Sequence, residues 1–123
     1  MILIVDDHLD SGAVLARLLK RRGYDAMAVS SGRAALAILQ SVRPELIVLD
    51  MHMPDLDGLS VLRQVRADAA TADVPVVLYT ADPDNAAIRE AKSLGAADFL
   101  VKGQVAWDEL CARITAHIGE VGT

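Results

Sequence analysis

Short apolar runs and longer amphipathic segments alternate along this chain from its first residues to its last helix. An apolar run of four or five residues bounded by polar residues is typical of a strand buried on both faces of a sheet. Apolar residues at three- and four-residue spacing predict helices with one buried face. We expect the strands at residues 2–5, 24–29, 46–49, 75–79 and 98–101.

One amphipathic segment follows each predicted strand. Asp10 or Ser11 is expected to cap the first helix, and Ser30 or Ser31 the second. The last helix is predicted over residues 107–118. Further start and stop signals lie at Asp57-Gly58, Asp82-Pro83-Asp84, Gly23, Pro44 and Gly95.

This order of elements predicts an α/β fold with a parallel sheet and right-handed crossovers. We expect a flavodoxin-like, doubly wound (βα)5 three-layer sandwich with strand order 2-1-3-4-5. No linker or shift in composition divides the chain. We therefore expect one domain over residues 1–119, with 120–123 as a tail or the stump of a linker.

Composition excludes several classes of function. The net charge of −5 and the scattered basic residues argue against direct nucleic-acid binding. A single cysteine, Cys111, excludes an internal disulfide. The first apolar run stops at Asp6 and is far too short to span a membrane. We expect a cytoplasmic domain without membrane contact.

Polar groups follow four of the five predicted strands: Asp6-Asp7, Asp50, Thr80 and Lys102. Because the carboxyl ends of parallel strands meet at one edge, these side chains are expected to share a pocket. Three carboxylates so close together repel one another, and Mg²⁺ is the natural counter-charge because it prefers oxygen ligands. With an ammonium and a hydroxyl nearby, the pocket is suited to phosphoryl transfer, with Asp50 as a candidate nucleophile.

Each of these residues also has a purely structural interpretation. Asp7 and Thr80 could cap helices, and Lys102 could be a solvated surface charge. His8 and His117 are expected to be surface histidines without the clustered partners that a metal site needs. The coincidence of five polar groups at one edge favours a functional pocket.

The chain resembles the response-regulator receiver domains of bacterial two-component signalling, over residues 2–118. Val5-Asp6-Asp7 is similar to the acidic pair of the family, and residues 50–58 to its phosphoacceptor segment. Tyr79-Thr80-Ala81 resembles the segment of the switch threonine, and residues 95–102 the run into the site lysine.

The resemblance implies a role for each site residue. Asp50 would accept a phosphoryl group from a sensor histidine kinase or phosphotransfer protein, and Lys102 would pair with a phosphoryl oxygen. Asp7, Asp50 and the backbone carbonyl of His52 would bind Mg²⁺, with Asp6 acting through metal-bound water. Such a domain is a phosphorylated signalling module rather than an enzyme.

The resemblance also implies a switch and its partners. Thr80 and Phe99 would move on phosphorylation and alter the face formed by the fourth helix, fifth strand and fifth helix. That face could form a homodimer or control an output domain fused beyond Thr123. His52 and Asp82 would tune the lifetime of the acyl phosphate by gating the attacking water.

Two positions depart from the family pattern. Lys102 is followed by Gly103, where the family usually has proline after a cis bond. A cis bond to a non-proline residue costs about 2.5–4 kcal/mol, so we expect a trans bond and a less firmly aimed lysine. Phe99 stands where many members have tyrosine.

Three alternatives compete with a working receiver. A degenerate receiver would keep the fold and act as a docking module independent of phosphorylation. A phosphatase of the haloacid-dehalogenase type needs a second aspartate two residues after the nucleophile, where this chain has His52. A flavin or nucleotide binder is disfavoured because no glycine-rich phosphate loop follows the first strand.

Overall fold

The computed structural model describes residues 1–118, and five strands alternate with five helices over this range. The predicted tail at 120–123 lies outside the described residues. Within them, no helix combines the length and apolar character needed to cross a membrane. The elements are β1 (Ile2–Val5), α1 (Leu9–Arg21), β2 (Ala26–Val29), α2 (Gly32–Leu39), β3 (Leu46–Leu49), α3 (Gly58–Ala67), β4 (Val76–Thr80), α4 (Asn85–Ser93), β5 (Asp98–Val101) and α5 (Trp107–Ala116).

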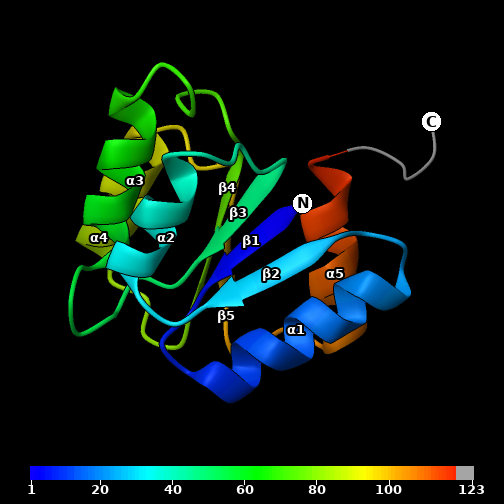
Figure 1. Cartoon of the computed structure of the whole chain (residues 1–123). Helices are drawn as coiled ribbons and strands as arrows, with labels where there is room; N and C mark the ends of the chain where they lie inside the picture. The colour runs from blue at the N-terminus through cyan, green and yellow to red at the C-terminus, as the bar shows by residue number, and fades with distance from the viewer. Residues whose placement is uncertain (119–123) are drawn as a thin grey trace.

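The strands form one parallel sheet in the order β2-β1-β3-β4-β5, which confirms the predicted flavodoxin-like topology. Helices α1 and α5 cover one face of the sheet, and α2, α3 and α4 cover the other (Figure 1). Val5 at the end of β1 pairs with Leu49 at the end of β3. The residues that directly follow these two strands therefore emerge side by side.

Residues of each inner strand alternate between two apolar layers. On β1, Leu3 and Val5 pack beneath α2 and α3, whereas Ile2 and Ile4 pack beneath α1 and α5. All four residues are buried, as are all four of β3. Burial on both faces explains why these strands appear in the sequence as continuous apolar runs rather than as alternating patterns.

Several predicted helix ends are confirmed. Ser31 Oγ accepts a hydrogen bond from the Ala34 backbone N–H at 3.1 Å and caps α2. Asp57 caps α3 and Asp84 caps α4 through their carboxylates, so Thr80 is not a cap. Gly95 after α4 has a φ of 76°, a conformation that glycine adopts without strain.

The prediction for the start of α1 was wrong. The helix begins at Leu9 with His8 at the N-cap position, so Asp10 and Ser11 lie inside its first turn. The side chain of His8 makes no capping hydrogen bond. Strand β2 starts at Ala26, two residues later than expected, and α5 ends at Ala116 rather than at 118.

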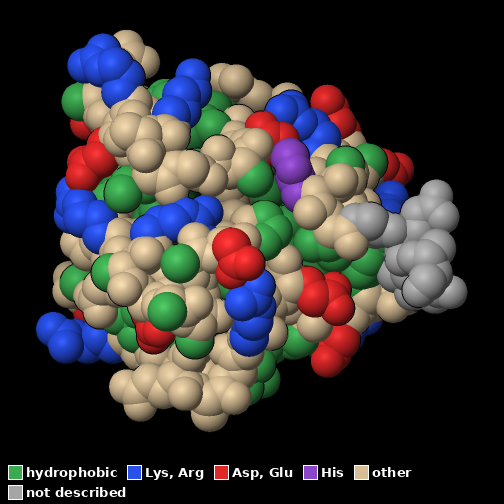
Figure 2. Space-filling view, turned by 90° about the horizontal axis from the view of Figure 1, so that it is seen from above, with side chains coloured by type: hydrophobic (Ala, Val, Ile, Leu, Met, Phe, Trp, Pro, Cys, Tyr) green, Lys and Arg blue, Asp and Glu red, His purple; other side chains and the backbone are tan. Residues whose placement is uncertain are grey.

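The surface seen from above in Figure 1 carries charges of both signs. Lysine and arginine side chains are interspersed there with aspartate and glutamate, without a continuous basic surface (Figure 2). This face offers no extended patch for a nucleic-acid backbone.

Candidate functional site

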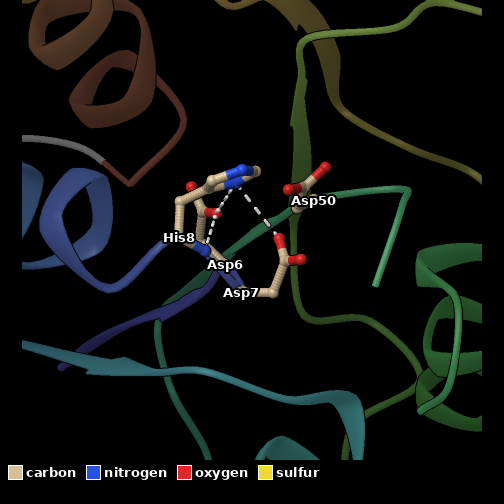
Figure 3. A group of neighbouring side chains, drawn as sticks. All are labelled: Asp6, Asp7, His8 and Asp50. Carbon is tan, nitrogen blue, oxygen red and sulfur yellow. Dashed lines mark hydrogen bonds and ion pairs between the residues drawn. The ribbon is translucent and has the colours of Figure 1, made fainter. Parts of the chain in front are cut away.

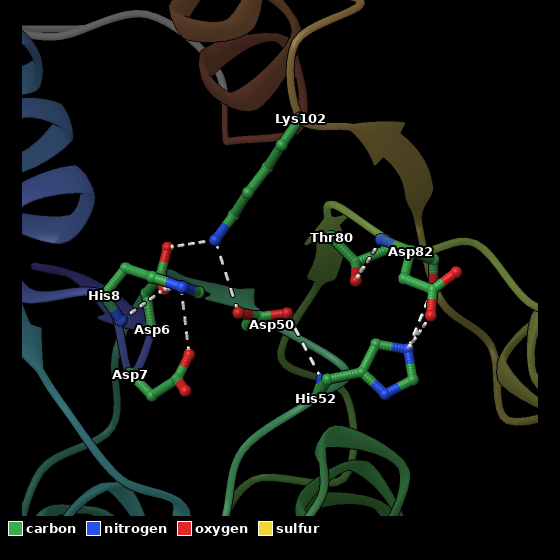
Figure 4. Close-up of polar contacts among 8 residues, drawn as sticks. All are labelled: Asp6, Asp7, His8, Asp50, His52, Thr80, Asp82 and Lys102. Carbon is green, nitrogen blue, oxygen red and sulfur yellow. Dashed lines mark hydrogen bonds and ion pairs between the residues drawn. The ribbon is translucent and has the colours of Figure 1, made fainter.

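Side chains from four strand ends meet at the carboxyl edge of the sheet, as the sequence predicted. Asp6 follows β1, Asp50 follows β3, Thr80 ends β4 and Lys102 follows β5. Asp50 lies between Lys102 on one side and Thr80 on the other (Figure 4). The topology thus brings together groups that are up to 96 residues apart in the chain.

Asp6, Asp7 and Asp50 form a carboxylate cluster with the imidazole of His8 (Figure 3). One oxygen or nitrogen atom from each of the four residues lies within 4.8 Å of the corresponding atoms of the others. The side chains of Asp6 and Asp50 are only 5% and 4% exposed. Close carboxylates with so little access to water favour a bound cation.

Asp7 supplies a second sign of a cation site. Its Oδ1 atom is buried and accepts no hydrogen bond. The nearest basic atom is His8 Nδ1 at 3.2 Å, which forms an ion pair only when the imidazole is protonated. A buried carboxylate oxygen without a hydrogen-bond donor is a suitable ligand for a hard divalent cation. The cluster therefore has the donor set that a metal ion requires.

Lys102 extends into the cluster. Its Nζ donates to Asp6 Oδ2 at 2.7 Å and to Asp50 Oδ2 at 3.3 Å, and its side chain is 14% exposed. The ammonium also lies over the ring of Tyr79, 5.6 Å from the centroid. None of the described peptide bonds is cis, so the predicted trans bond to Gly103 is confirmed.

The charges of the pocket shift the proton affinities of its members. Burial raises the pKa of Asp50, and the nearby Lys102 ammonium and the His52 backbone N–H offset only part of that effect. Burial lowers the pKa of Lys102, but the hydrogen bond to Asp6 and the charge of Asp50 outweigh it and raise the pKa overall. The lysine is therefore held as a cation beside the carboxylates.

His52 contributes its backbone to the pocket and directs its ring elsewhere (Figure 4). Its backbone N–H donates to Asp50 Oδ1 at 3.3 Å. The ring nitrogen Nε2 lies 2.9 Å from the carbonyl oxygen of Asp82 and 4.0 Å from its Oδ2 atom. The two residues predicted to tune the acyl phosphate are thus in contact across the mouth of the pocket.

The two predicted switch residues lie on the neighbouring strands β4 and β5. Thr80 is fully buried, and its Oγ1 accepts a hydrogen bond from the Asp82 backbone N–H at 3.4 Å. Phe99 is half-buried and lines a cavity of about 330 Å³ between α4 and β5, together with Leu78, Ile88 and Ala91. The aromatic ring therefore borders empty volume.

The prediction that His8 lacks the clustered partners of a metal site was wrong, whereas His117 pairs with a single carboxylate. His8 lies beside Asp6 and Asp7, and His117 Nε2 lies 3.3 Å from Asp98 Oδ2. The position of His8 directly after the acidic pair was the available signal. No other residue pattern indicated this contact, because a single histidine before a helix is usually a surface residue.

Comparisons with known proteins identify the family that the sequence resembles. The response regulator receiver domain model matches residues 2–115. The DNA-binding response regulator MtrA of Mycobacterium tuberculosis (strain ATCC 25618 / H37Rv) is 33% identical over 117 residues, which cover 95% of this chain and 50% of MtrA. The probable transcriptional regulator ycf27 of Porphyridium aerugineum is 36% identical over 120 residues, covering 98% of this chain and 48% of ycf27.

Among solved structures, the Vibrio cholerae chemotaxis protein CheY4 superposes with a TM-score of 0.85 at 27% identity, covering 94% of this chain and 95% of CheY4. The chain spans about half the length of the curated relatives it matches. The family model covers every strand and all the polar strand ends described above. This chain belongs to the response regulator receiver domain family.

Proposed function

We propose that Asp50 accepts a phosphoryl group from a sensor histidine kinase or phosphotransfer protein, in a reaction that depends on Mg²⁺. The observation that carries the proposal is the convergence of Asp6, Asp7 and Asp50 with the Lys102 ammonium in one largely buried pocket. Of the three carboxylates, Asp50 is the one that lies between Lys102 and Thr80 (Figure 4). A phosphoryl group on Asp50 would be within reach of both.

The residues present fit the cation that the family implies. Asp7, Asp50 and the backbone carbonyl of His52 would hold Mg²⁺, and Asp6 would contribute through a bound water. The unpartnered Asp7 Oδ1 atom supports this assignment. The ion would supply positive charge that neutralises the carboxylates and the phosphoryl oxygens.

In the transfer step, a carboxylate oxygen of Asp50 forms a bond to phosphorus while the bond from phosphorus to the donor's histidine nitrogen breaks. The electron pair of that bond leaves with the imidazole. Lys102 already donates to Asp50 at 3.3 Å and needs only a small movement to pair with a phosphoryl oxygen. Together with the His52 backbone N–H, it favours the ionised Asp50 against the cost of burial.

Phosphorylation would change the population of two packing states rather than build a new fold. Thr80 would turn its hydroxyl from the Asp82 N–H towards the phosphoryl group, and Phe99 would move relative to the cavity beside it. The face formed by α4, β5 and α5 would then differ between the two states. We propose this face as the contact with an output domain or a second copy of the chain.

The contact between His52 and Asp82 supports the proposal that these two residues control the lifetime of the acyl phosphate. Replacing either residue by alanine opens the mouth of the pocket and is expected to change the dephosphorylation rate while phosphorylation persists. Decay of phosphorylated protein after donor removal measures this rate. Unchanged lifetimes in both variants would contradict the assignment.

We also propose that this receiver domain controls an output domain. Relatives twice as long, such as the DNA-binding response regulator MtrA, support an output domain fused after Thr123. The family favours a phosphorylated receiver over a docking module that works without phosphorylation. A cytoplasmic location follows if the phosphoryl donor is a kinase of the two-component type.

The central test is phosphorylation by a small phosphodonor. The wild-type protein and Asp50→Asn are incubated with donor and Mg²⁺ or EDTA, and products are separated on a phosphate-sensitive gel. Intact mass spectrometry then counts the phosphoryl groups. A single addition to wild type that needs Mg²⁺ and is lost in Asp50→Asn is expected. Absence of any Mg²⁺-dependent addition would refute the proposal and favour the docking module.

A further inference from the structure

We propose that the cavity between α4 and β5 is a binding site for a small aromatic carboxylate. The rings of such a ligand would lie against the apolar walls of the cavity, and its carboxylate would pair with the ammonium of Lys92. Binding of this ligand does not depend on phosphorylation. Its effect on the switch, through Phe99, rests on the proposed function.

The cavity is separate from the acidic pocket and large enough for a ligand. It measures about 330 Å³ and is bounded by α4, by the turn that follows this helix, by β5 and by one residue of β4. Asp50, Thr80 and Lys102 are not among the residues that line it. Sites for small molecules generally have volumes of about 300–1,000 Å³, so this cavity suits a ligand of one or two rings.

The walls of the cavity are largely apolar. Leu78 and Ala91 are buried members of the apolar layer on the α2, α3 and α4 side of the sheet, and Ala96 and Phe99 pack against that layer. Ile88 completes the wall on α4. The two alanines leave space for a flat group, and the Phe99 ring offers an aromatic contact. An aromatic ligand therefore matches these walls.

The charges at the cavity determine which polar group the ligand carries. Lys92 and Asp98 are the two charged residues that line it. Asp98 is already paired, because it accepts from Arg113 Nη2 at 2.7 Å and lies 3.3 Å from His117 Nε2. The side chain of Lys92, in contrast, makes no hydrogen bond or ion pair with any residue in the range 1–118. The uncompensated charge at the cavity is therefore positive.

A second cation lies on the turn between α4 and β5. Arg66 Nε donates to the Leu94 carbonyl oxygen at 2.7 Å, and its Nη2 donates to that of Gly95 at 3.2 Å. Ala96, the next residue of this turn, lines the cavity. Positive charge on this side disfavours a cationic ligand, and the single free ammonium of Lys92 matches the single charge of a carboxylate.

Occupancy of the cavity would act on the switch through Phe99. The Phe99 ring lines the cavity, and its backbone N–H donates to Asp98 Oδ1 at 2.8 Å. A bound ligand occupies the volume beside the ring and restrains the movement proposed for it on phosphorylation. The ligand would therefore bind the unphosphorylated state more tightly and shift the population towards that state.

The test is titration of the whole chain with naphthalene-2-carboxylate and with the neutral naphthalene-2-carboxamide, without any phosphodonor. Isothermal titration calorimetry is applied to wild type, Lys92→Gln and Lys20→Gln, after circular dichroism has checked folding. Lys20, in the last turn of α1, is the matched control. Wild type and Lys20→Gln should bind the carboxylate about three-fold more tightly than the carboxamide, and Lys92→Gln should bind the two compounds equally.

A cavity-filling variant and chemical-shift mapping locate the site. Ala96→Leu places a larger side chain in the cavity and should weaken both compounds about ten-fold or more. In wild type, the carboxylate should shift the methyl resonances of Ile88 and Ala91. With donor and Mg²⁺ present, it should also reduce the phosphorylated fraction of wild type and leave that of Ala96→Leu unchanged.

Three results would overturn the inference. These are absence of binding to wild type at millimolar carboxylate, shifts confined to another face, and equal preference for the carboxylate in wild type and Lys92→Gln. Dimerisation that Ala96→Leu abolishes, without binding of either compound, would assign the cavity to a second copy and also overturn it. Failure of the proposed function would appear separately, as absent Mg²⁺-dependent phosphorylation of wild type without either compound.

Discussion

Asp50→Asn is expected to stabilise the fold while it removes the proposed phosphoacceptor. The Asp50 side chain is 4% exposed and stands close to two other carboxylates. An asparagine keeps the shape and can still accept the His52 backbone N–H with its amide oxygen. Lys102 would keep its 2.7 Å contact with Asp6, so no buried charge is left unpaired.

The size of the effect follows from the burial of the carboxylate. Desolvation is the largest cause of the raised pKa of Asp50, and the charge of Asp6 adds to it. At an effective dielectric constant of about 20, the attraction of Lys102 at 3.3 Å is about 5 kcal/mol. This attraction and the His52 backbone N–H offset only part of the cost of burial. We expect a gain in the free energy of unfolding of about 1–3 kcal/mol.

The assay is urea unfolding at pH 7 in EDTA, followed by circular dichroism. Because the pKa of folded Asp50 is raised above its ordinary value of 3.8, its unfavourable contribution is complete above the folded pKa and disappears as the pH falls towards 3.8. The difference in free energy of unfolding between Asp50→Asn and wild type should therefore decrease as the pH is lowered. Added Mg²⁺ should also decrease this difference at pH 7, because it stabilises wild type more than the variant. A variant that is equally or less stable at pH 7 in EDTA would refute this reasoning.

Asp55→Asn is the control substitution, and it is expected to lower the free energy of unfolding rather than raise it. The backbone N–H groups of Arg33, Leu56 and Gly32 lower the pKa of Asp55, and the Arg33 N–H donates at 3.0 Å. Its carboxylate therefore stabilises the fold above pH 3.8, and the contribution is lost as the pH falls through the lowered folded pKa. The variant should unfold at lower urea than wild type at pH 7.

Two further substitutions test the geometry around Asp50 and Lys102. Gly58→Ala places a Cβ 2.3 Å from the backbone carbonyl oxygen of Asp50, so urea unfolding should show a loss of about 2–3 kcal/mol. Gly12→Ala, whose nearest contact is 3.3 Å, should stay within about 1 kcal/mol of wild type, and equal losses would contradict the steric argument. Tyr79→Leu removes the ring beneath the Lys102 ammonium and should slow phosphorylation about two- to five-fold, whereas Tyr79→Phe should retain the rate. Equal rates in the leucine and phenylalanine variants would exclude a role for the ring.

The sheet could be predicted because its chemistry is local. The inner strands are buried on both faces, so their sequences are continuous apolar runs that few other structures produce. Strand β2 was less well defined, since it lies at the edge of the sheet and leaves Met27 45% exposed. Parallel topology then placed the polar strand ends together without any knowledge of side-chain positions.

The details of the pocket depend on geometry that no local pattern contains. The ring of His8 reaches the cluster because α1 begins one residue after it, whereas the sequence favoured a start at Asp10 or Ser11. The N-cap lies two or three residues earlier than expected, and this places the exposed His8 beside Asp7. For His52 the backbone, and not the ring, reaches the pocket. Its N–H donates to Asp50, whereas its ring nitrogen lies beside the Asp82 carbonyl oxygen.

Lys102 shows how groups distant in sequence can replace a local restraint. Without the usual following proline, the sequence predicted a less firmly aimed side chain. Carboxylates after β1 and β3 and the Tyr79 ring on β4 nevertheless all contact its ammonium. Gly103, with a φ of 84°, turns the chain immediately after the lysine, and the Gln104 N–H donates to the Val101 carbonyl oxygen at 3.1 Å. The direction of the ammonium is therefore set by the charges of the pocket, so neutralising those charges would displace it more than altering the residue that follows it.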